Sequence, residues 1–136
     1  MSATHSQALI TSYYDAFNRG DIDGMLACVT DDLIHDTNQG DRRLGRERFH
    51  AFCARMSHHY KEQLENIVVM TTADGARAAA EFNVNGKYLV TETGLPDAKG
   101  QTYKLPAGTF FAIHDGKIAR VTTYYNLTDW IMQVSA

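Results

Sequence analysis

Apolar residues in the first part of the chain recur at intervals of three and four, which is the spacing of one helix face. They predict a first helix over residues 6–18, a second that begins after Asp21, and a third over residues 46–60. Gly20 suits the end of the first helix, because glycine adopts the left-handed conformation found there without strain. Asp21 can then cap the second helix, so the two helices should meet in a tight corner.

Beyond residue 60 the apolar period changes from 3.6 to two, which indicates strands. The alternation is clearest from Arg77 to Val84. Strands are predicted over residues 64–70, 77–84, 87–93, 101–114 and 117–126. A further short strand, residues 33–38, lies between the second and third helices, and a short helix over residues 129–134 ends the pattern.

Turn residues divide these strands. Asp115-Gly116 predicts a tight hairpin, and Asn85-Gly86 predicts either a hairpin turn or a bulge. Residues 94–100 form the longest expected loop. Pro106 falls inside a predicted strand, where a residue without an N–H indicates a sheet edge or a bulge.

Helices that precede a meander of strands indicate an α+β fold rather than a wound parallel sheet. A strongly curved antiparallel sheet can wrap around the N-terminal helices and form a cone. Such a cone leaves a pocket at its open end. The chain has 136 residues and no repeat or linker, so residues 1–136 are expected to form one domain.

Composition narrows the functional classes. The net charge of -3 gives no basic surface for nucleic acid or anionic lipid. No apolar run approaches the roughly 20 residues that span a bilayer, and the N-terminus lacks a secretory pattern. Cys28 and Cys53 lie in helical apolar patterns and are expected to be buried thiols of a cytoplasmic protein. No phosphate-binding or metal-ligand motif is found, so no cofactor and no metal are expected.

Asp36 is the first candidate for chemistry, because it ends the short strand between two helices. If its side chain faces the pocket, burial penalises the charged form, raises the pKa and makes the carboxylate a general base. It could instead cap a turn. Asn38 lies on the same face of the strand and could orient Asp36 or a water, or could be an ordinary turn residue.

Aromatic and hydroxyl side chains are expected to form the pocket wall. Alternation turns five of them inward from the strands, and three more come from the helices. His59 in the last turn of the third helix could act as acid, base or gate, or only complement the helix dipole. The predicted substrate-binding wall comprises Phe17, Phe52, Met56, Phe82, Thr109, Phe111, Thr123 and Tyr125, and it suits a small apolar organic ligand.

Four local motifs together indicate a family resemblance: the corner Tyr13-Tyr14-Asp15-Ala16-Phe17-Asn18-Arg19-Gly20-Asp21, then Ile34-His35-Asp36, Gly94-Leu95-Pro96 and Asp115-Gly116-Lys117-Ile118. With these motifs the chain resembles the nuclear transport factor 2-like superfamily, and within it the ketosteroid-isomerase-like and SnoaL-like polyketide cyclase branch. The resemblance implies a curved-sheet cone and a homodimer joined through the sheets.

The resemblance also implies roles for two residues. Asp36 falls where ketosteroid isomerases keep their proton-transferring acid, and Tyr13 falls where they keep the tyrosine that hydrogen-bonds the oxyanion. The second acid of those isomerases would fall at Thr109, or at Gly108 if the register slips by one. Neither residue is a strong acid donor, so the chain departs from true steroid isomerases at this position.

Four functional hypotheses follow. The first is cofactor-free proton transfer, isomerase or cyclase-like, on an apolar carbonyl compound, with Asp36 as base and Tyr13 as donor. The second is a non-catalytic binding module for an apolar metabolite. The third is an epoxide-opening hydrolase, which needs an acid–base pair bridged by an arginine to activate water, whereas alternation points Arg120 outward. The fourth is a structural dimerisation domain.

Overall fold

The computed structural model describes residues 2–136. In chain order the elements are α1 (Ala3–Arg19), α2 (Ile22–Leu26), β1 (Val29–Thr37), β2 (Arg43–Leu44), α3 (Arg46–His59), β3 (Tyr60–Thr71), β4 (Arg77–Tyr88), β5 (Thr102–His114), β6 (Lys117–Tyr125) and α4 (Leu127–Ser135).

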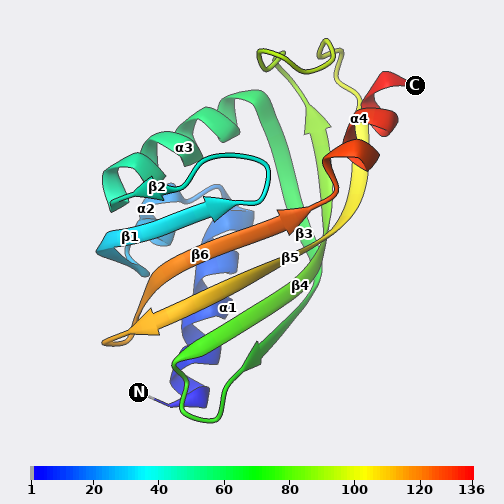
Figure 1. Cartoon of the computed structure of the whole chain (residues 1–136). Helices are drawn as coiled ribbons and strands as arrows, with labels where there is room; N and C mark the ends of the chain where they lie inside the picture. The colour runs from blue at the N-terminus through cyan, green and yellow to red at the C-terminus, as the bar shows by residue number, and fades with distance from the viewer. Residues whose placement is uncertain (1) are drawn as a thin grey trace.

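The strands form one six-stranded sheet in the order β2-β1-β6-β5-β4-β3. Neighbouring strands are antiparallel except β1 and β6, which run parallel. The sheet curves strongly, and α1, α2 and α3 lie along its concave side (Figure 1). The predicted α+β cone is therefore confirmed.

The corner between α1 and α2 forms as its sequence predicts. Gly20 has a φ of 72°, and its N–H donates to the carbonyls of Ala16 and Phe17. The Asp21 carboxylate then caps α2 by accepting a hydrogen bond from the backbone N–H of Gly24 at 2.9 Å. This corner sends the chain from α1 back towards the sheet.

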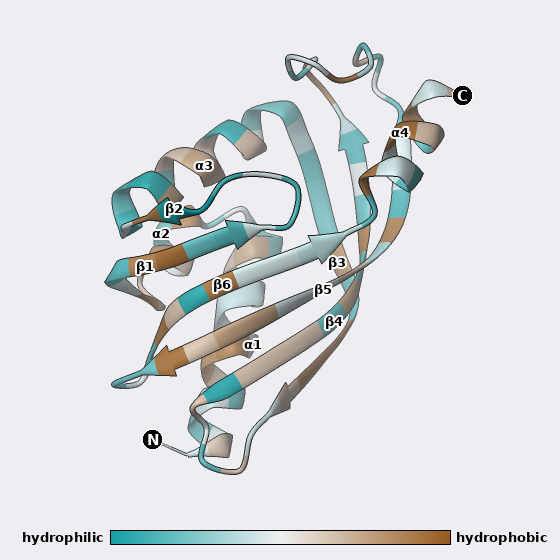
Figure 2. Ribbon diagram, viewed as in Figure 1, coloured by the Kyte–Doolittle hydropathy of each residue, from teal (hydrophilic) through white to brown (hydrophobic). Residues whose placement is uncertain are grey.

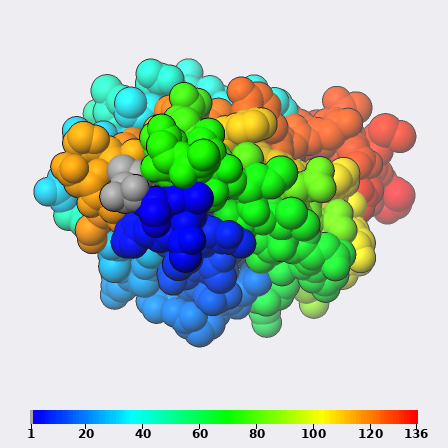
Figure 3. All heavy atoms as spheres, turned by 90° about the horizontal axis from the view of Figure 1, so that it is seen from below, coloured from blue at the N-terminus to red at the C-terminus, as the bar shows by residue number. Residues whose placement is uncertain are grey.

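The narrow end of the cone is closed by the start of α1. The Ser6 hydroxyl donates to the carbonyl of Gly75, in the turn between β3 and β4, at 2.6 Å. In the view from below, the first turns of α1 lie directly against that turn (Figure 3). Gly75 has a φ of 74° and lies so close to Ser2 that a Cβ would overlap its backbone.

The turn or bulge predicted at Asn85-Gly86 is wrong. Asn85 pairs with Gln63 on one side and Lys104 on the other, so β4 continues without interruption to Tyr88. The strand predicted over residues 87–93 is therefore the end of β4 followed by a loop that begins at Leu89. Paired neighbours on both sides hold Gly86 in an extended strand, although Asn-Gly favours a turn in isolation.

Pro106 lies in β5, which is an internal strand of the sheet rather than an edge strand. It pairs with Asn83 of β4 in regular register. On the other side, pairing with β6 starts only at Ala107. The strand is thus locally an edge at Pro106, where a missing N–H is tolerated.

Apolar and polar residues alternate along the strands, which gives the ribbons in Figure 2 a banded appearance. Phe82, Val84 and Phe111 on the inner face are buried in the core. The outer face carries large apolar side chains that are about half exposed: Val68, Met70, Phe110 and Tyr124. Among residues 2–136, no helix is long and apolar enough to cross a membrane.

Candidate functional site: a cavity in the cone

A cavity of about 890 Å³ lies between the inner face of the sheet and the helices. Its volume falls within the range of small-molecule sites. The cavity brings together most of the residues predicted to line it, namely Tyr13, Phe17, Phe52, Met56, Phe82, Thr109, Thr123 and Tyr125. Aromatic and aliphatic side chains dominate the wall, and a few polar groups interrupt it.

Asp36 does not face this cavity, so the predicted orientation of its side chain is wrong. Leu33 and His35 take the inward positions of β1, and Asp36 lies on the outer face of the sheet. There its carboxylate accepts two hydrogen bonds from the Arg42 guanidinium, at 2.8 and 3.1 Å. Complete burial of Leu33 in the core sets this orientation, because Asp36 lies three positions further along the strand and so faces the opposite side. The ion pair with Arg42 neutralises the charge of Asp36 outside the cavity.

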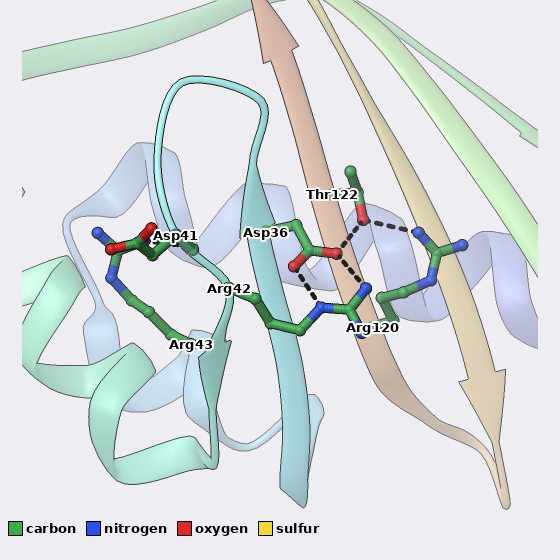
Figure 4. Close-up of polar contacts among 6 residues, drawn as sticks. All are labelled: Asp36, Asp41, Arg42, Arg43, Arg120 and Thr122. Atoms are coloured by element: carbon green, nitrogen blue, oxygen red, sulfur yellow. Dashed lines mark hydrogen bonds and ion pairs between the residues drawn. The ribbon is translucent and has the colours of Figure 1, made fainter.

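The Asp36–Arg42 ion pair is part of a hydrogen-bond network on the outer face of the sheet (Figure 4). The Thr122 hydroxyl donates to Asp36 at 3.3 Å, and the Arg120 guanidinium donates to the Thr122 oxygen at 2.6 Å. Hydrogen bonds from Arg42 hold the pKa of Asp36 below its usual value. A paired carboxylate with a lowered pKa is a poor general base. Arg120 points outward as predicted, so this network does not place an arginine between acids inside the cavity.

Three further predicted residues also lie away from the cavity lining. Asn38 is exposed beyond the end of β1. A ring nitrogen of His59 lies 2.8 Å from the Val90 carbonyl, so this histidine holds the loop after β4. Phe111 is fully buried behind the wall and packs edge-on against Tyr13.

His35 lines the cavity in the position expected for Asp36. It is 3% exposed, its ring packs against Phe49 and Phe52, and its Nδ1 has no hydrogen-bonding partner among residues 2–136. Burial, together with the charge of Arg43, lowers the pKa of His35 to about 4. The imidazole is therefore neutral at pH 7.

Glu62 is a cavity residue that the sequence analysis missed. Because β3 starts directly after α3, Tyr60, Glu62 and Leu64 point inward in alternation. The Tyr103 hydroxyl donates to Oε2 of Glu62 at 2.5 Å. Burial raises the pKa of Glu62, and the Tyr103 hydrogen bond partly offsets that rise.

Gly86 makes the contact between Tyr103 and Glu62 possible. Glu62, Gly86 and Tyr103 form one row across β3, β4 and β5. The Tyr103 ring lies over Gly86 so closely that a Cβ there would overlap the ring. The absence of a side chain at Gly86 thus lets a tyrosine reach across a whole strand to the acid.

Two further side chains complete this end of the cavity. Trp130 of α4 packs edge-on against the Tyr103 ring, with 5.9 Å between the two ring centroids. The Tyr125 hydroxyl lies near enough to Glu62 and Glu92 for their charges to add to the effect of burial and raise its pKa. Tyr125 therefore stays protonated and can donate a hydrogen bond to an oxygen in the cavity.

Glu92 has partners of its own at the same end. It accepts hydrogen bonds from the Tyr60 hydroxyl and from the Arg55 guanidinium. With an arginine and a phenol bound, its charge is compensated. Glu62 is the carboxyl group at this end without a cationic partner among residues 2–136.

A row of hydroxyl groups lies deeper in the cone. The oxygens of Thr109 and Thr123 are 3.5 Å apart. Burial raises the pKa of both Tyr13 and Tyr14, so their hydroxyls remain protonated donors. Thr109, at the expected place of the second isomerase acid, thus contributes a neutral hydroxyl.

Comparison with known proteins agrees with this architecture. The family model described as a SnoaL-like domain matches residues 10–121. A candidate polyketide cyclase from Pseudomonas putida KT2440 is 58% identical, with a TM-score of 0.94 over 95% of this chain and 97% of that one. Another from Silicibacter sp. TM1040 is 57% identical, with a TM-score of 0.96 over 100% and 99% of the two chains.

More distant structures share the fold alone. An epoxide hydrolase of the LEH-like type from M. tuberculosis is 18% identical, with a TM-score of 0.73 over 98% of this chain and 91% of that one. No curated protein matches the chain significantly.

Proposed function

Because this chain belongs to the SnoaL-like domain family, we propose that it is a cofactor-free acid–base enzyme. Its reaction is isomerase- or cyclase-like proton transfer on a small, mostly apolar carbonyl compound held in the cavity. The observation that carries the proposal is the Glu62 carboxyl group, which lines the cavity with Oε2 held by Tyr103.

Glu62 has the properties of a general base. Burial raises its pKa towards working pH, where a base is strong enough to remove a proton and still largely ionised. Tyr103 fixes one carboxylate oxygen, which leaves Oε1 for the substrate. In this proposal Oε1 takes a proton from the carbon next to the substrate carbonyl, and the C–H electron pair moves onto the carbonyl oxygen as an enolate.

Tyr125 is the proposed donor to that enolate oxygen. Tyr125 and Glu62 both line the cavity, and the raised pKa of Tyr125 keeps the proton on the phenol. A hydrogen bond that strengthens as charge develops lowers the barrier. Return of the proton from Glu62 to another carbon completes an isomerisation. In a cyclisation the enolate carbon instead attacks a second carbonyl of the same molecule, and the oxygen of that carbonyl takes the proton back from Glu62 to give an alcohol.

Exchange of α-protons tests this proposal without knowledge of the natural substrate. Ketone probes such as 2-tetralone are incubated with the protein in D₂O, and loss of the α-proton signal is followed by NMR. Glu62→Gln should reduce enzyme-dependent exchange at least 100-fold, as expected for loss of a general base. Glu65→Gln is the matched control, because Glu65 is an exposed acid on the same strand. Exchange by Glu62→Gln at the wild-type rate would refute the assignment.

A non-catalytic binding module is the second candidate. The orientation of Asp36 favours it, because the acid expected as the base pairs with Arg42 outside the cavity. In that case the ketones would bind without accelerated exchange in the wild-type protein. Equilibrium binding measured on the same samples separates the two functions.

We also propose that the partner of this chain is a second copy of it, in a homodimer joined through the outer sheet face. Phe110 and Tyr124 contact each other edge-on there and are about half exposed. Exposed apolar patches of this kind are common at protein interfaces. Phe110→Asp should give a monomer in sedimentation velocity, whereas a wild-type protein that is already monomeric would contradict the proposal.

The two free cysteines are consistent with the proposed cytoplasmic location.

A further inference from the structure

We infer that His35 and Arg43 form an anion subsite at the β1–β2 end of the cavity, and that the ligand carries a carboxylate there. The inference rests on the proposed function only in placing a small organic ligand in this cavity. It extends the substrate class from an apolar carbonyl compound to one with a carboxylate at the end away from the reacting carbonyl.

The two side chains are built into one site. His35 and Arg43 are direct partners in the β1–β2 ladder, and both line the cavity. Residues directly opposite each other in an antiparallel pair project to the same face. Both also contact the ring of Phe52: the His35 ring centroid lies 4.5 Å away, and the Arg43 guanidinium carbon lies 4.6 Å away. Phe52 thus holds the imidazole and the guanidinium beside each other.

The hydrogen-bonding capacity of neither group is filled by the other described residues. Nδ1 of His35 is buried without a partner among residues 2–136. The Arg43 guanidinium has one long hydrogen bond in this region, 3.4 Å to the backbone carbonyl of Asp41. Three other arginines, by contrast, each form an ion pair: Arg42 with Asp36, Arg46 with Asp31 and Arg55 with Glu92. An unpaired buried polar atom is rare in folded proteins, so one on a ring that lines the cavity supports a ligand at this end of it.

A carboxylate matches both groups. Its two oxygens can accept charge-assisted hydrogen bonds from the guanidinium and from an imidazole N–H. The groups whose charges act on His35 are Arg43 and Asp36, and α3 presents the rings of Phe49 and Phe52 to it. A carboxylate beside the ring adds a negative charge and raises the pKa of His35. Binding should therefore take up protons below neutral pH.

The test compares 2-naphthoate with its neutral analogue 2-acetylnaphthalene by titration calorimetry. The wild-type protein should bind 2-naphthoate about tenfold or more tightly than the ketone, as expected for a charge-assisted contact. Arg43→Met should remove this preference by weakening 2-naphthoate binding about tenfold or more. Arg42→Met is the matched control, because Arg42 is adjacent in sequence but lies on the outer face, and it should keep the preference.

Proton uptake separates a binding role of His35 from a packing role. At pH 6, 2-naphthoate is titrated in two buffers of different ionisation enthalpy, which gives the number of protons bound. The wild-type protein should take up a fraction of a proton, and His35→Phe should take up none. Equal affinities for the two probes, undetectable 2-naphthoate binding, or a preference that survives Arg43→Met would each overturn the subsite. None of these results affects the exchange assay, which tests Glu62 separately.

Discussion

The Tyr103 hydroxyl donates a hydrogen bond to Oε2 of Glu62 from β5, a strand that does not adjoin β3 in the sheet. The tyrosine spans β4 by lying over Gly86. The acid is thereby fixed on the cavity wall by a residue 41 positions away in sequence. The same hydrogen bond lowers the pKa of Glu62 against the opposing effect of burial.

Tyr103→Phe should raise the pKa of Glu62. Without the hydroxyl, burial acts on the carboxylate with less compensation, and the protonated form is favoured. The acidic limb of the pH profile for ketone exchange should move to higher pH, because the base must be ionised to act. Rates measured across the pH range for the two proteins check this. An acidic limb that stays in place or moves to lower pH would contradict the role of Tyr103.

Gly86→Ala should reproduce the effect of Tyr103→Phe. The added methyl group occupies the space of the Tyr103 ring, which must then move away from Glu62. The double variant should show little further change in the pH profile, because both substitutions remove one contact. Additive shifts in the double variant would mean that Gly86 acts by another route. Thermal unfolding of each variant serves as a check on folding.

Acid should destabilise the fold through His35. Its pKa is about 4 in the folded protein and about 6.5 in the unfolded chain, so the unfolded chain binds the proton first. Stability should fall as the pH drops from about 6.5 to 4, by about 3 kcal/mol at most from this group. Urea unfolding of His35→Phe should lack this decrease, whereas the exposed control His50→Phe should retain it. An identical pH dependence in His35→Phe and wild type would show that His35 does not titrate in this way.

Asp36→Asn should leave ketone exchange unchanged, because the carboxylate lies outside the cavity. At neutral pH the substitution should cost about 1 kcal/mol or less, since Arg42 is largely exposed. The pKa of Asp36 is lowered in the fold, so its contribution is present above its unfolded pKa and disappears as pH falls through the folded value. Loss of exchange activity in a folded Asp36→Asn variant would contradict this prediction and show that the reaction requires Asp36.

The sequence predicts the architecture well where local chemistry decides it. Gly20-Asp21 and Asp115-Gly116 adopt the predicted conformations because glycine and aspartate favour them in any context. Asn85-Gly86 has equally strong local preferences, yet two neighbouring strands hold it extended. The reason for that glycine is a tyrosine ring from another strand, which local pattern does not indicate.

The candidate site was predicted less completely. In β1 the run Leu33-Ile34 is apolar at two successive positions, so alternation alone could not decide whether His35 or Asp36 faces inward. Packing of Leu33 in the core decides it. Glu62 was missed because the residues after Tyr60 look like a polar helix end. Alternation counted back from Leu64 is the signal that could have placed Glu62 inward.

The pKa of Glu62 in the wild-type protein tests the central claim most directly. Carbon-13 NMR of the glutamate side-chain carboxyl groups, assigned with Glu62→Gln, gives this value across a pH titration. A titration midpoint above the ordinary glutamate value of 4.5 is predicted for Glu62, with a further rise in Tyr103→Phe. A midpoint at or below that value would contradict a buried acid–base group in the cavity.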